Sequence, residues 1–313
     1  MPRPGITCHG RQRPRRENRQ EEVEKIYPLP AKVSRCVQGL GNFFNFGLYF
    51  NKWLWVVPEN LGFEYKFQAK PKKKVLTKRE EREGYQADKI LAHYERLKNN
   101  LNKFLTNRHE AIDTICQAFK KLGYEALDKT YKLKTSLIIG LGNAHPTERG
   151  FTFHWTLGIP YIPAESIKGV VRLAYLVNKA QQEPNFFEHW AKEDEAFWAY
   201  LAELFGRVEK EKSTQRGKVI FLDALPVGPP TLTLEITTCH YPDYYGGKRG
   251  PTEDQNPNPL PFLAVAPGAL FRFVFLMDEA LNKEVKEKFV KAFEAALSDH
   301  GFGAKTALGH GRF

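Results

Sequence analysis

Residues 301–313 read GFGAKTALGHGRF and are the most distinctive stretch of the 313-residue chain. Two glycine pairs of the form GxG flank a short segment, and Lys305, His310 and Arg312 lie among them. Glycine allows positive φ angles and lets a backbone approach another group closely. Free amide N–H groups beside cationic side chains suit an anion such as phosphate. The pattern therefore indicates either a phosphate-binding loop or a tight structural turn, and leaves both open.

The stretch differs from two familiar phosphate-binding motifs. Ala304 stands where a P-loop needs glycine before its lysine, and no helix is expected to follow. Thr306 takes the place of the third glycine of a dinucleotide-binding fingerprint, and no strand leads into it. A phosphate site here would be of another kind.

A second motif, PYIPAESIKGVVR at residues 160–172, delivers the chain through a proline-bounded turn into a predicted helix. Lys168 and Arg172 are four residues apart, so they share one helix face, opposite the apolar stripe. An ordinary solvated basic face explains them by default. A strip that follows an RNA backbone is the alternative.

A third motif, GLGNAHPTERG at residues 140–150, contains His145 and Arg149, and His154 follows shortly. The two histidines could act as an acid–base pair in hydrolysis. Histidines with a structural role in a loop are the commoner case.

Hydrophobic periodicity predicts the order of elements in the rest of the chain. Expected helices lie at 84–129, with a stop at Gly123, and at 165–180, 192–205 and 280–298. Expected strands lie at 133–141, 218–225, 232–238 and 270–277. This α+β order is compatible with a βαββαβ ferredoxin-like unit, the topology of the RNA-recognition motif.

The composition favours an anionic partner and a reducing compartment. The net charge is +11, and cations placed on phosphates release counterions. The four cysteines are far apart in sequence, which indicates neither a zinc or redox motif nor a disulfide framework. No apolar signal segment opens the chain, and polar residues interrupt the most apolar stretch, 36–57. We expect a cytoplasmic protein with no membrane association.

Three regions are expected. Residues 1–30 form a basic, disordered arm that could settle on RNA. Residues 31–130 form an aromatic and helical N-terminal region that packs on the core, with a basic linker from Lys70 to Arg79. Residues 131–313 form the core and end in the glycine-rich loop.

Several motifs in one order identify a family. LIIGLGNAHPTERGFTFHWTLGIPYIPAESIKGVVR at 137–172, LFG at 204–206, FLDALP at 221–226 and GFGAKTALGHGRF at 301–313 together resemble the RAMP superfamily of CRISPR proteins. Within it they are similar to the sixth subunits of type III-B (Cmr) effector complexes. The resemblance covers about residues 133–313, and the set is far more specific than any single motif.

The resemblance implies a ferredoxin-like (RRM-like) RAMP core with a helical N-terminal region and insertions. It implies a non-catalytic backbone subunit that binds the 3′ part of the guide RNA (crRNA) through its sugar-phosphate backbone, beside target RNA and other Cmr subunits, with no cofactor and no metal. A projecting loop is expected from Tyr241 to Pro261. The residues expected at RNA are Lys168, Arg172, Lys248, Arg249, Gly301, Gly303, Lys305, Gly309, His310, Gly311 and Arg312, with His145, Arg149 and His154 near it.

Two departures from the family pattern qualify this expectation. Glu165 occupies a position where many relatives have a small or hydroxyl residue, and its carboxylate would repel phosphate from the first helical turn. The chain stops at Phe313, so the last strand of a βαββαβ unit must be very short or absent. The alternative function is a metal-independent endoribonuclease that processes precursor guide RNA, with His145 or His154 beside a tyrosine or lysine.

Overall fold

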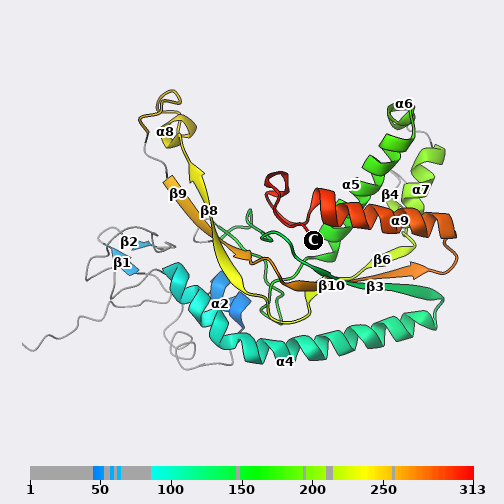
Figure 1. The fold of residues 1–313 in the computed structure, drawn as a ribbon, viewed down its shortest axis with the longest axis horizontal. Coiled ribbons are helices and arrows are strands. Elements are labelled where there is room, and N and C mark those ends of the chain that lie inside the picture. Colours follow the sequence, from blue (N-terminus) through cyan, green and yellow to red (C-terminus); the bar gives the residue numbers. More distant parts are fainter. Residues whose placement is uncertain are drawn as a thin grey trace, which may run out of the picture.

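The computed structural model describes residues 45–52, 57–59, 62–64, 86–145, 149–192, 195–208, 214–255 and 258–313. The predicted basic arm at 1–30 and the basic linker from Lys70 to Arg79 lie outside the described residues. The described part is an α+β structure with helices on both faces of an antiparallel sheet (Figure 1).

A four-stranded antiparallel sheet lies at the centre. Its strands are β3 (Tyr124–Lys132), β6 (Val219–Phe221), β7 (Leu225–Pro226) and β10 (Leu270–Asp278). The order is β3-β10-β6, and β7 also pairs with β10. In the register, Phe275 of β10 lies opposite both Leu127 and Phe221. β10 is therefore the central strand, and its residues from Phe271 to Met277 are buried except for Arg272.

Aromatic side chains fill the space between the sheet and two helices, α5 (Ala164–Gln182) and α9 (Lys283–Ala295). The ring of Phe275 lies 4.7 Å from that of Phe293 and 5.3 Å from that of Phe289. Alternate residues of a strand point to one face, so Phe273 joins them, 5.3 Å from Phe293. Helices α5 and α9 also pack against each other.

The opposite face of the sheet is covered by one long helix, α4 (Gln86–Lys120). The predicted helical stripe is confirmed in its main members: Ile90, Tyr94, Leu97, Leu101 and Leu105 are all buried. Arg272 emerges on this face. Its Nε donates to Asp128 Oδ1 at 3.0 Å, and its Nη2 donates to Asp128 and to Asp113 of α4. One guanidinium thus ties the helix to two strands.

A two-stranded hairpin extends from the core (Figure 1). It consists of β8 (Leu232–Cys239) and β9 (Asn258–Val265), and the short helix α8 (Pro242–Tyr245) lies at its tip. Antiparallel bonding between Leu137 and Val265 fastens its base to the core. The predicted projecting loop, Tyr241 to Pro261, is therefore the outer part of this hairpin.

The predicted strand at 133–141 is wrong. The strand lies just before it, at Tyr124–Lys132, and begins directly after the predicted helix stop at Gly123, overlapping the end of the stretch 84–129. β3 is an edge strand whose Glu125, Asp128 and Lys129 are exposed, so apolar alternation is weak. The apolar residues Leu137, Ile138 and Ile139 are buried instead in an extended segment with a single isolated bridge.

The remaining elements complete the description. They are α2 (Phe46–Lys52), β1 (Val57–Glu59), β2 (Gly62–Glu64), α6 (Phe186–Ala191), α7 (Glu195–Phe205), β4 (Arg207–Val208), β5 (Thr214–Gln215), the π-helical turn η1 (Ala296–His300) and the 3-10 turn η2 (Thr306–Leu308). The predicted helices at 165–180, 192–205 and 280–298 correspond to α5, α7, and α9 with η1. No helix in the described ranges combines the length and apolar character that a bilayer span requires.

We expect Arg272→Met to lower the free energy of unfolding by about 2 kcal/mol, since it leaves two carboxylates without their shared cation. The Arg272 side chain is only 14% exposed. Lys283→Met is the matched control, because Lys283 is 91% exposed and its pair with Glu287 spans 4.0 Å. Urea unfolding should show that the control lowers the free energy of unfolding by less than about 0.5 kcal/mol. Equal effects of the two changes would contradict the role given to Arg272.

Candidate nucleic-acid interface

The predicted glycine positions of the C-terminal loop all have positive φ: Gly301 at 74°, Gly303 at 90°, Gly309 at 88° and Gly311 at 72°. Two of them also allow a close backbone approach. A Cβ atom on Gly303 would lie 2.1 Å from the carbonyl oxygen of Ile138, and one on Gly311 would lie 1.9 Å from that of Phe302. No other residue type fits these two positions without a shift of backbone.

Backbone hydrogen bonds dock the two ends of the loop on the segment 134–138. Ala304 N donates to Ile138 O at 2.7 Å, and Gly311 N donates to Ser136 O at 2.9 Å. Phe302 and Phe313 are buried in the aromatic core, 5.7 and 5.3 Å from the ring of Phe273. The ends of the loop are thus a structural turn, as one of the two interpretations of the sequence expected.

The tip of the loop, residues 304–310, is partly or fully exposed. Lys305 has φ 57° and is the one non-glycine residue with positive φ in the described part of the chain. Such a conformation is uncommon for a side chain with a Cβ and costs on the order of 1 kcal/mol. Strained residues gather at functional sites more often than elsewhere, which makes Lys305 the leading candidate.

Two cations of the loop have unusual surroundings. Lys305 Nζ donates to Thr237 Oγ1 of β8 at 3.2 Å and lies 5.7 Å from the ring centre of Phe262. Arg312 Nη2 donates to Thr306 O at 3.3 Å, whereas its Nη1 is buried and has no acceptor within the described residues. A buried donor of this kind is destabilising unless it finds an acceptor.

The basic residues predicted on α5 are accessible. Arg172 is exposed, Lys168 is half-buried, and neither forms an ion pair with another described residue. α5 packs against η1, which leads directly into the C-terminal loop. Glu165 is exposed in the first turn, and Ala164 N donates to Asp223 Oδ1 at 2.8 Å. The carboxylate of Asp223 therefore occupies this helix start, and the effect predicted for Glu165 stays a prediction.

Arg249 of the hairpin tip has a different environment from that expected of a free RNA contact. Its guanidinium pairs with Asp243 at 3.2 Å and with Asp254 at 2.8 Å, and these carboxylates raise its pKa. Lys248 is exposed. Among the described residues, no group of three or more His, Cys, Asp or Glu side chains is arranged to hold a metal ion. The two ion pairs of Arg249 thus join Asp243 to Asp254 at the tip of the hairpin.

His145 is a packing residue. Its Nε2 lies 2.8 Å from Phe50 O, and its ring stacks on that of Phe50 at 4.4 Å. Burial is the largest cause of its lowered pKa, and Lys52 lowers that pKa further. Arg149 is half-buried and also has a partner within the chain. These contacts fasten α2 to the loop at 140–150.

His154 organises a tight turn. Leu157 N donates to its Nδ1 at 3.4 Å, and Thr156 Oγ1 lies 3.1 Å from the same atom. Its ring lies edge-on to Tyr161, 5.2 Å away. Burial is again the first cause of its lowered pKa, followed by Arg108. Its Nδ1 is therefore occupied by the turn that it stabilises.

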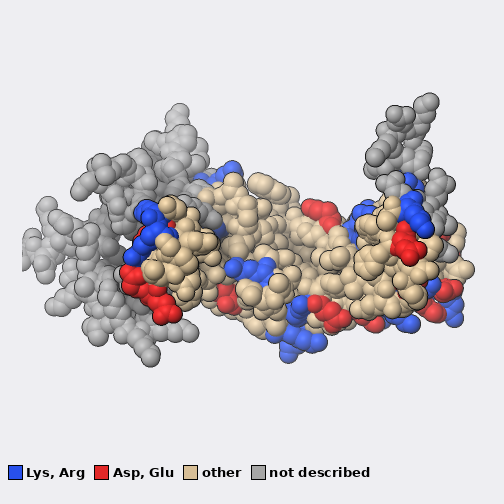
Figure 2. All heavy atoms as spheres, turned by 90° about the horizontal axis from the view of Figure 1, so that it is seen from above, with Lys and Arg blue, Asp and Glu red and all other residues tan. Residues whose placement is uncertain are grey.

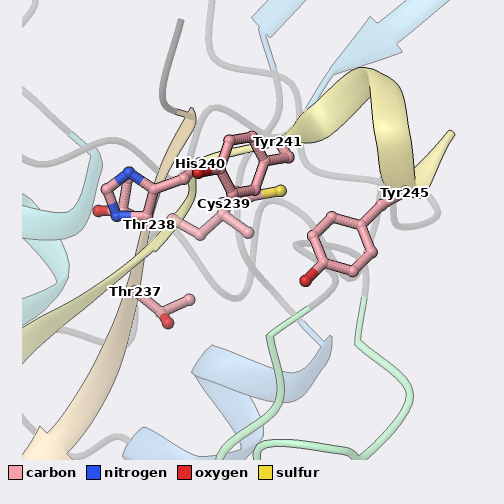
Figure 3. A pocket seen from close by; sticks show the side chains of 7 residues that line it. Thr237, Thr238, Cys239, His240, Tyr241 and Tyr245 are labelled. Atoms are coloured by element: carbon pink, nitrogen blue, oxygen red, sulfur yellow. The ribbon is translucent and has the colours of Figure 1, made fainter. Parts of the chain in front are cut away.

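Sequence reasoning missed a pocket on the hairpin, lined by Thr237, Thr238, Cys239, His240, Tyr241, Tyr245 and Leu260 (Figure 3). A tyrosine-rich segment, HYPDYY at 240–245, was the available signal. Basic residues do not form one continuous stripe on the face that Figure 2 shows, where they occur in small groups beside acidic ones. Contacts with a polyanion on that face would be local.

Comparison with known proteins gives one family. The family model of the RAMP superfamily matches residues 130–313, more than half of the chain. A Cmr6 subunit of the CRISPR system of Pyrococcus furiosus is 30% identical over 231 residues, which are 60% of this chain and 67% of that protein. A Cmr6 subunit of Saccharolobus solfataricus is 26% identical over 208 residues, 64% of this chain and 62% of that protein.

Solved structures of the same group are also similar. The crystal structure of Cmr6 from Pyrococcus furiosus matches with 27% identity and a TM-score of 0.36, covering 61% of this chain and 97% of that one. A chain of a type III-B Cmr-beta complex bound to cognate target RNA matches with 22% identity and a TM-score of 0.49, covering 72% of each chain. The family assignment rests on the sequence matches.

We expect Gly311→Ala to destabilise the chain by at least about 2 kcal/mol. The new methyl group would clash with Phe302 O, and alanine would also have to adopt a strained positive φ. Gly309→Ala is the matched control, since φ is 88° there and nothing lies within 4 Å of the added Cβ. The control should lose about 1 kcal/mol. Thermal unfolding that ranks the two variants equally would show that close packing does not hold the loop.

We expect the free energy of unfolding to fall as the pH drops below the ordinary histidine pKa of 6.5, because burial lowers the pKa of His145 and His154 in the folded chain. The unfolded chain then binds more protons, which disfavours folding. His145→Gln with His154→Asn keeps a polar atom at each bonded position and should lessen the slope of the profile between about pH 7.5 and 5. The slope that remains is due in part to His93, whose pKa burial also lowers. His240→Gln, at an exposed ring, is the matched control. An unaltered slope in the double variant would refute this assignment.

Proposed function

We propose, because this chain belongs to the RAMP superfamily, that it is a backbone subunit of a type III-B CRISPR ribonucleoprotein complex. Its relatives in Pyrococcus and Saccharolobus are named as Cmr6 subunits, which supports this assignment. We further propose that it binds the 3′ part of the guide RNA through the sugar-phosphate backbone, in the cytoplasm, alongside target RNA and neighbouring Cmr subunits.

The observation that carries RNA binding is the conformation of Lys305. A lysine held at φ 57° at the exposed tip of a rigidly docked loop presents a cation in a fixed place. Arg312, with its buried and unpartnered Nη1, lies in the same loop. Two cations and a strained backbone together suit a phosphate better than they suit an apolar partner.

Binding of this kind should be independent of base sequence. Guide sequences differ, and the phosphate backbone is common to all of them. Each cation placed on a phosphate contributes to the salt dependence of affinity, whichever base is attached. Lys168 and Arg172 on α5 would extend the contact along the RNA backbone.

We propose that the subunit has no catalytic role. A metal-independent endoribonuclease would need a histidine able to exchange protons with a ribose hydroxyl. His145 is stacked on Phe50, and Nδ1 of His154 is held by its own turn. Burial also lowers the pKa of both imidazoles, which disfavours the protonated form that the acid partner of an acid–base pair needs.

We also propose that β3, α5, β6 with β7, β10 and α9 form a ferredoxin-like unit. Their order along the chain is β-α-β-β-α, and the sheet order β3-β10-β6 places the first strand beside the third. The final strand would lie along β3. Residues 312–313 run instead beside Lys134 and Leu297, where Arg312 O accepts from Lys134 N at 2.8 Å.

We expect Lys305→Ala with Arg172→Ala to weaken the affinity for single-stranded RNA of any sequence. The slope of log affinity against log salt should become shallower by about 1.4, because about two phosphate contacts are lost and each contributes about 0.7 on a single strand. Fluorescence anisotropy across a salt series measures both quantities. Lys283→Ala with Lys288→Ala removes the same charge from α9 and should change little. An unchanged slope in the first variant would count against phosphate contact at these residues.

We expect labelled precursor guide RNA to be bound and left intact by the purified chain, with or without magnesium. Denaturing gels over an extended incubation provide the measurement. Cleavage that His154→Asn abolishes would overturn the non-catalytic assignment in favour of the endoribonuclease.

A further inference from the structure

The outer edge of β3 is open. β3 pairs with β10 in an unbroken register and is the last strand in the sheet order (Figure 1). Bonds just beyond its two ends show which of its residues bond to β10. Leu133 N donates to Ala269 O at 2.8 Å, and at the other end Glu279 N donates to Gly123 O at 2.9 Å. Because bonding alternates along an antiparallel ladder, the odd-numbered residues of β3 bond to β10 and the even-numbered ones face away from it.

The backbone groups that face away have a partner only beyond the end of the strand. Lys134 N donates to Arg312 O at 2.8 Å, as its even number requires. Within β3, the outward groups of Ala126, Asp128 and Thr130 have no backbone partner among the described residues. All three residues are exposed. A row of such groups is a template on which another strand can pair.

Two of the features that keep sheet edges from pairing are missing on β3. Its sequence, YEALDKTYK, contains no proline, and its register with β10 has no bulge. Charged residues remain, and they are of both signs: Glu125, Asp128, Lys129 and Lys132. Such charges oppose or favour pairing according to the register that brings them together.

Two copies of β3 are complementary in one antiparallel register. With Leu127 opposite Leu127 across a two-fold axis, Glu125 of each copy lies opposite Lys129 of the other. Opposite charges directly across two strands attract. The outward backbone groups meet as well, because Ala126 of each copy then lies opposite Asp128 of the other. Leu127, Glu125 and Lys129 fall in non-hydrogen-bonded pairs, in which opposed side chains lie closest.

The side chains that would meet are accessible. Glu125 Oε2 accepts from Lys286 Nζ at 3.1 Å, and the Glu125 side chain is still 60% exposed. Lys129 is exposed and forms no ion pair with another described residue. Each Glu125 can therefore meet a second cation without losing the first.

Other registers of the same two strands are less favourable. Centring the pairing on Asp128 places two carboxylates opposite each other, and centring it on Lys129 does the same with two ammonium groups. Like charges directly opposite are destabilising. Centring it on Thr130 brings in Lys134, whose outward N–H already bonds to Arg312. Only the first register pairs opposite charges and leaves that bond undisturbed.

We propose that the free chain self-associates through this edge, so that β3 of a second copy continues the sheet across a two-fold axis. The occupant is a second copy because its own β3 supplies the complementary charges at the required spacing. The inference goes beyond RNA binding and does not depend on it. Each copy has a net charge of +11, which opposes association at low salt. An extended segment of a different protein is the rival occupant.

Sedimentation of the full chain over a range of concentrations tests the proposal, at about 0.15 M salt, where charges more than about 8 Å apart are largely screened. Glu125→Lys places a lysine opposite Lys129 and should raise the dimer dissociation constant by at least about tenfold. Adding Lys129→Glu restores opposite charges in both pairs and should return the constant to its original value. Glu253→Lys is the matched control, since it makes the same charge change at an exposed residue of the hairpin and should alter nothing.

A backbone variant tests the hydrogen bonds of the edge separately from its charges. Ala126→Pro removes one outward N–H and no bond to β10, and proline is tolerated on an edge strand where the N–H faces solvent. It should abolish the dimer and leave the circular dichroism spectrum of the monomer unchanged. In the unaltered chain, hydrogen exchange in a peptide that spans residues 124–132 should slow as the protein concentration rises.

Each contrary outcome identifies a different error. A chain that sediments as a monomer at every concentration overturns the proposal. A dimer that persists in both Glu125→Lys and Ala126→Pro uses another surface, which also overturns it. If the edge peptide is protected only when other subunits of the complex are added, the occupant is a different protein and the second copy is wrong. RNA binding and its salt slope are measured independently and stand or fall apart from these results.

Discussion

The structure depends on an extended segment, residues 134–138, that hydrogen bonds on two sides. Leu137 exchanges both of its backbone bonds with Val265, at 3.0 and 2.8 Å, and so holds the base of the hairpin. The carbonyl groups of Ser136 and Ile138 point the other way and accept from Gly311 and Ala304. One short segment therefore fixes the hairpin and the C-terminal loop relative to each other. Their proximity, which brings Lys305 onto Thr237, follows from this shared support.

Much of the fold could be predicted from the sequence because helices repeat their apolar residues every three or four positions. The buried stripe of α4 and the extent of α5 follow from that pattern alone. β3 does not follow from the sequence, because an edge strand keeps polar side chains on its exposed positions and the more apolar segment after it gives the stronger strand pattern. Buried apolar runs and strands cannot be told apart by composition when the backbone partner is far away in sequence.

The candidate site was only partly visible in the sequence, and for a different physical reason. Glycine pairs indicate that the backbone needs freedom. They do not show whether a ligand or another part of the chain requires it. At Gly303 and Gly311 the requirement is internal, since the carbonyl oxygens of Ile138 and Phe302 occupy the space of a side chain. At Lys305 a side chain accompanies the positive φ, and that side chain contacts Thr237 and Phe262 of the hairpin. Likewise, only the contacts with Phe50 and Leu157 identify His145 and His154 as packing residues.

Arg249 and Lys305 are both basic and lie on or beside the hairpin, but their positive charges have different roles. Arg249 forms ion pairs with Asp243 and Asp254, and these pairs hold the shape of the tip. Among the described residues, the ammonium of Lys305 contacts a hydroxyl and an aromatic ring, and neither carries a full negative charge. An incoming phosphate must compete with two carboxylates for Arg249, and with no carboxylate for Lys305 among these contacts. Displacing the two carboxylates from Arg249 would cost the energy of those ion pairs, so Arg249 keeps them and the hairpin keeps its shape. Lys305 has no such pair among these contacts, so the loop can bind an anion without breaking one.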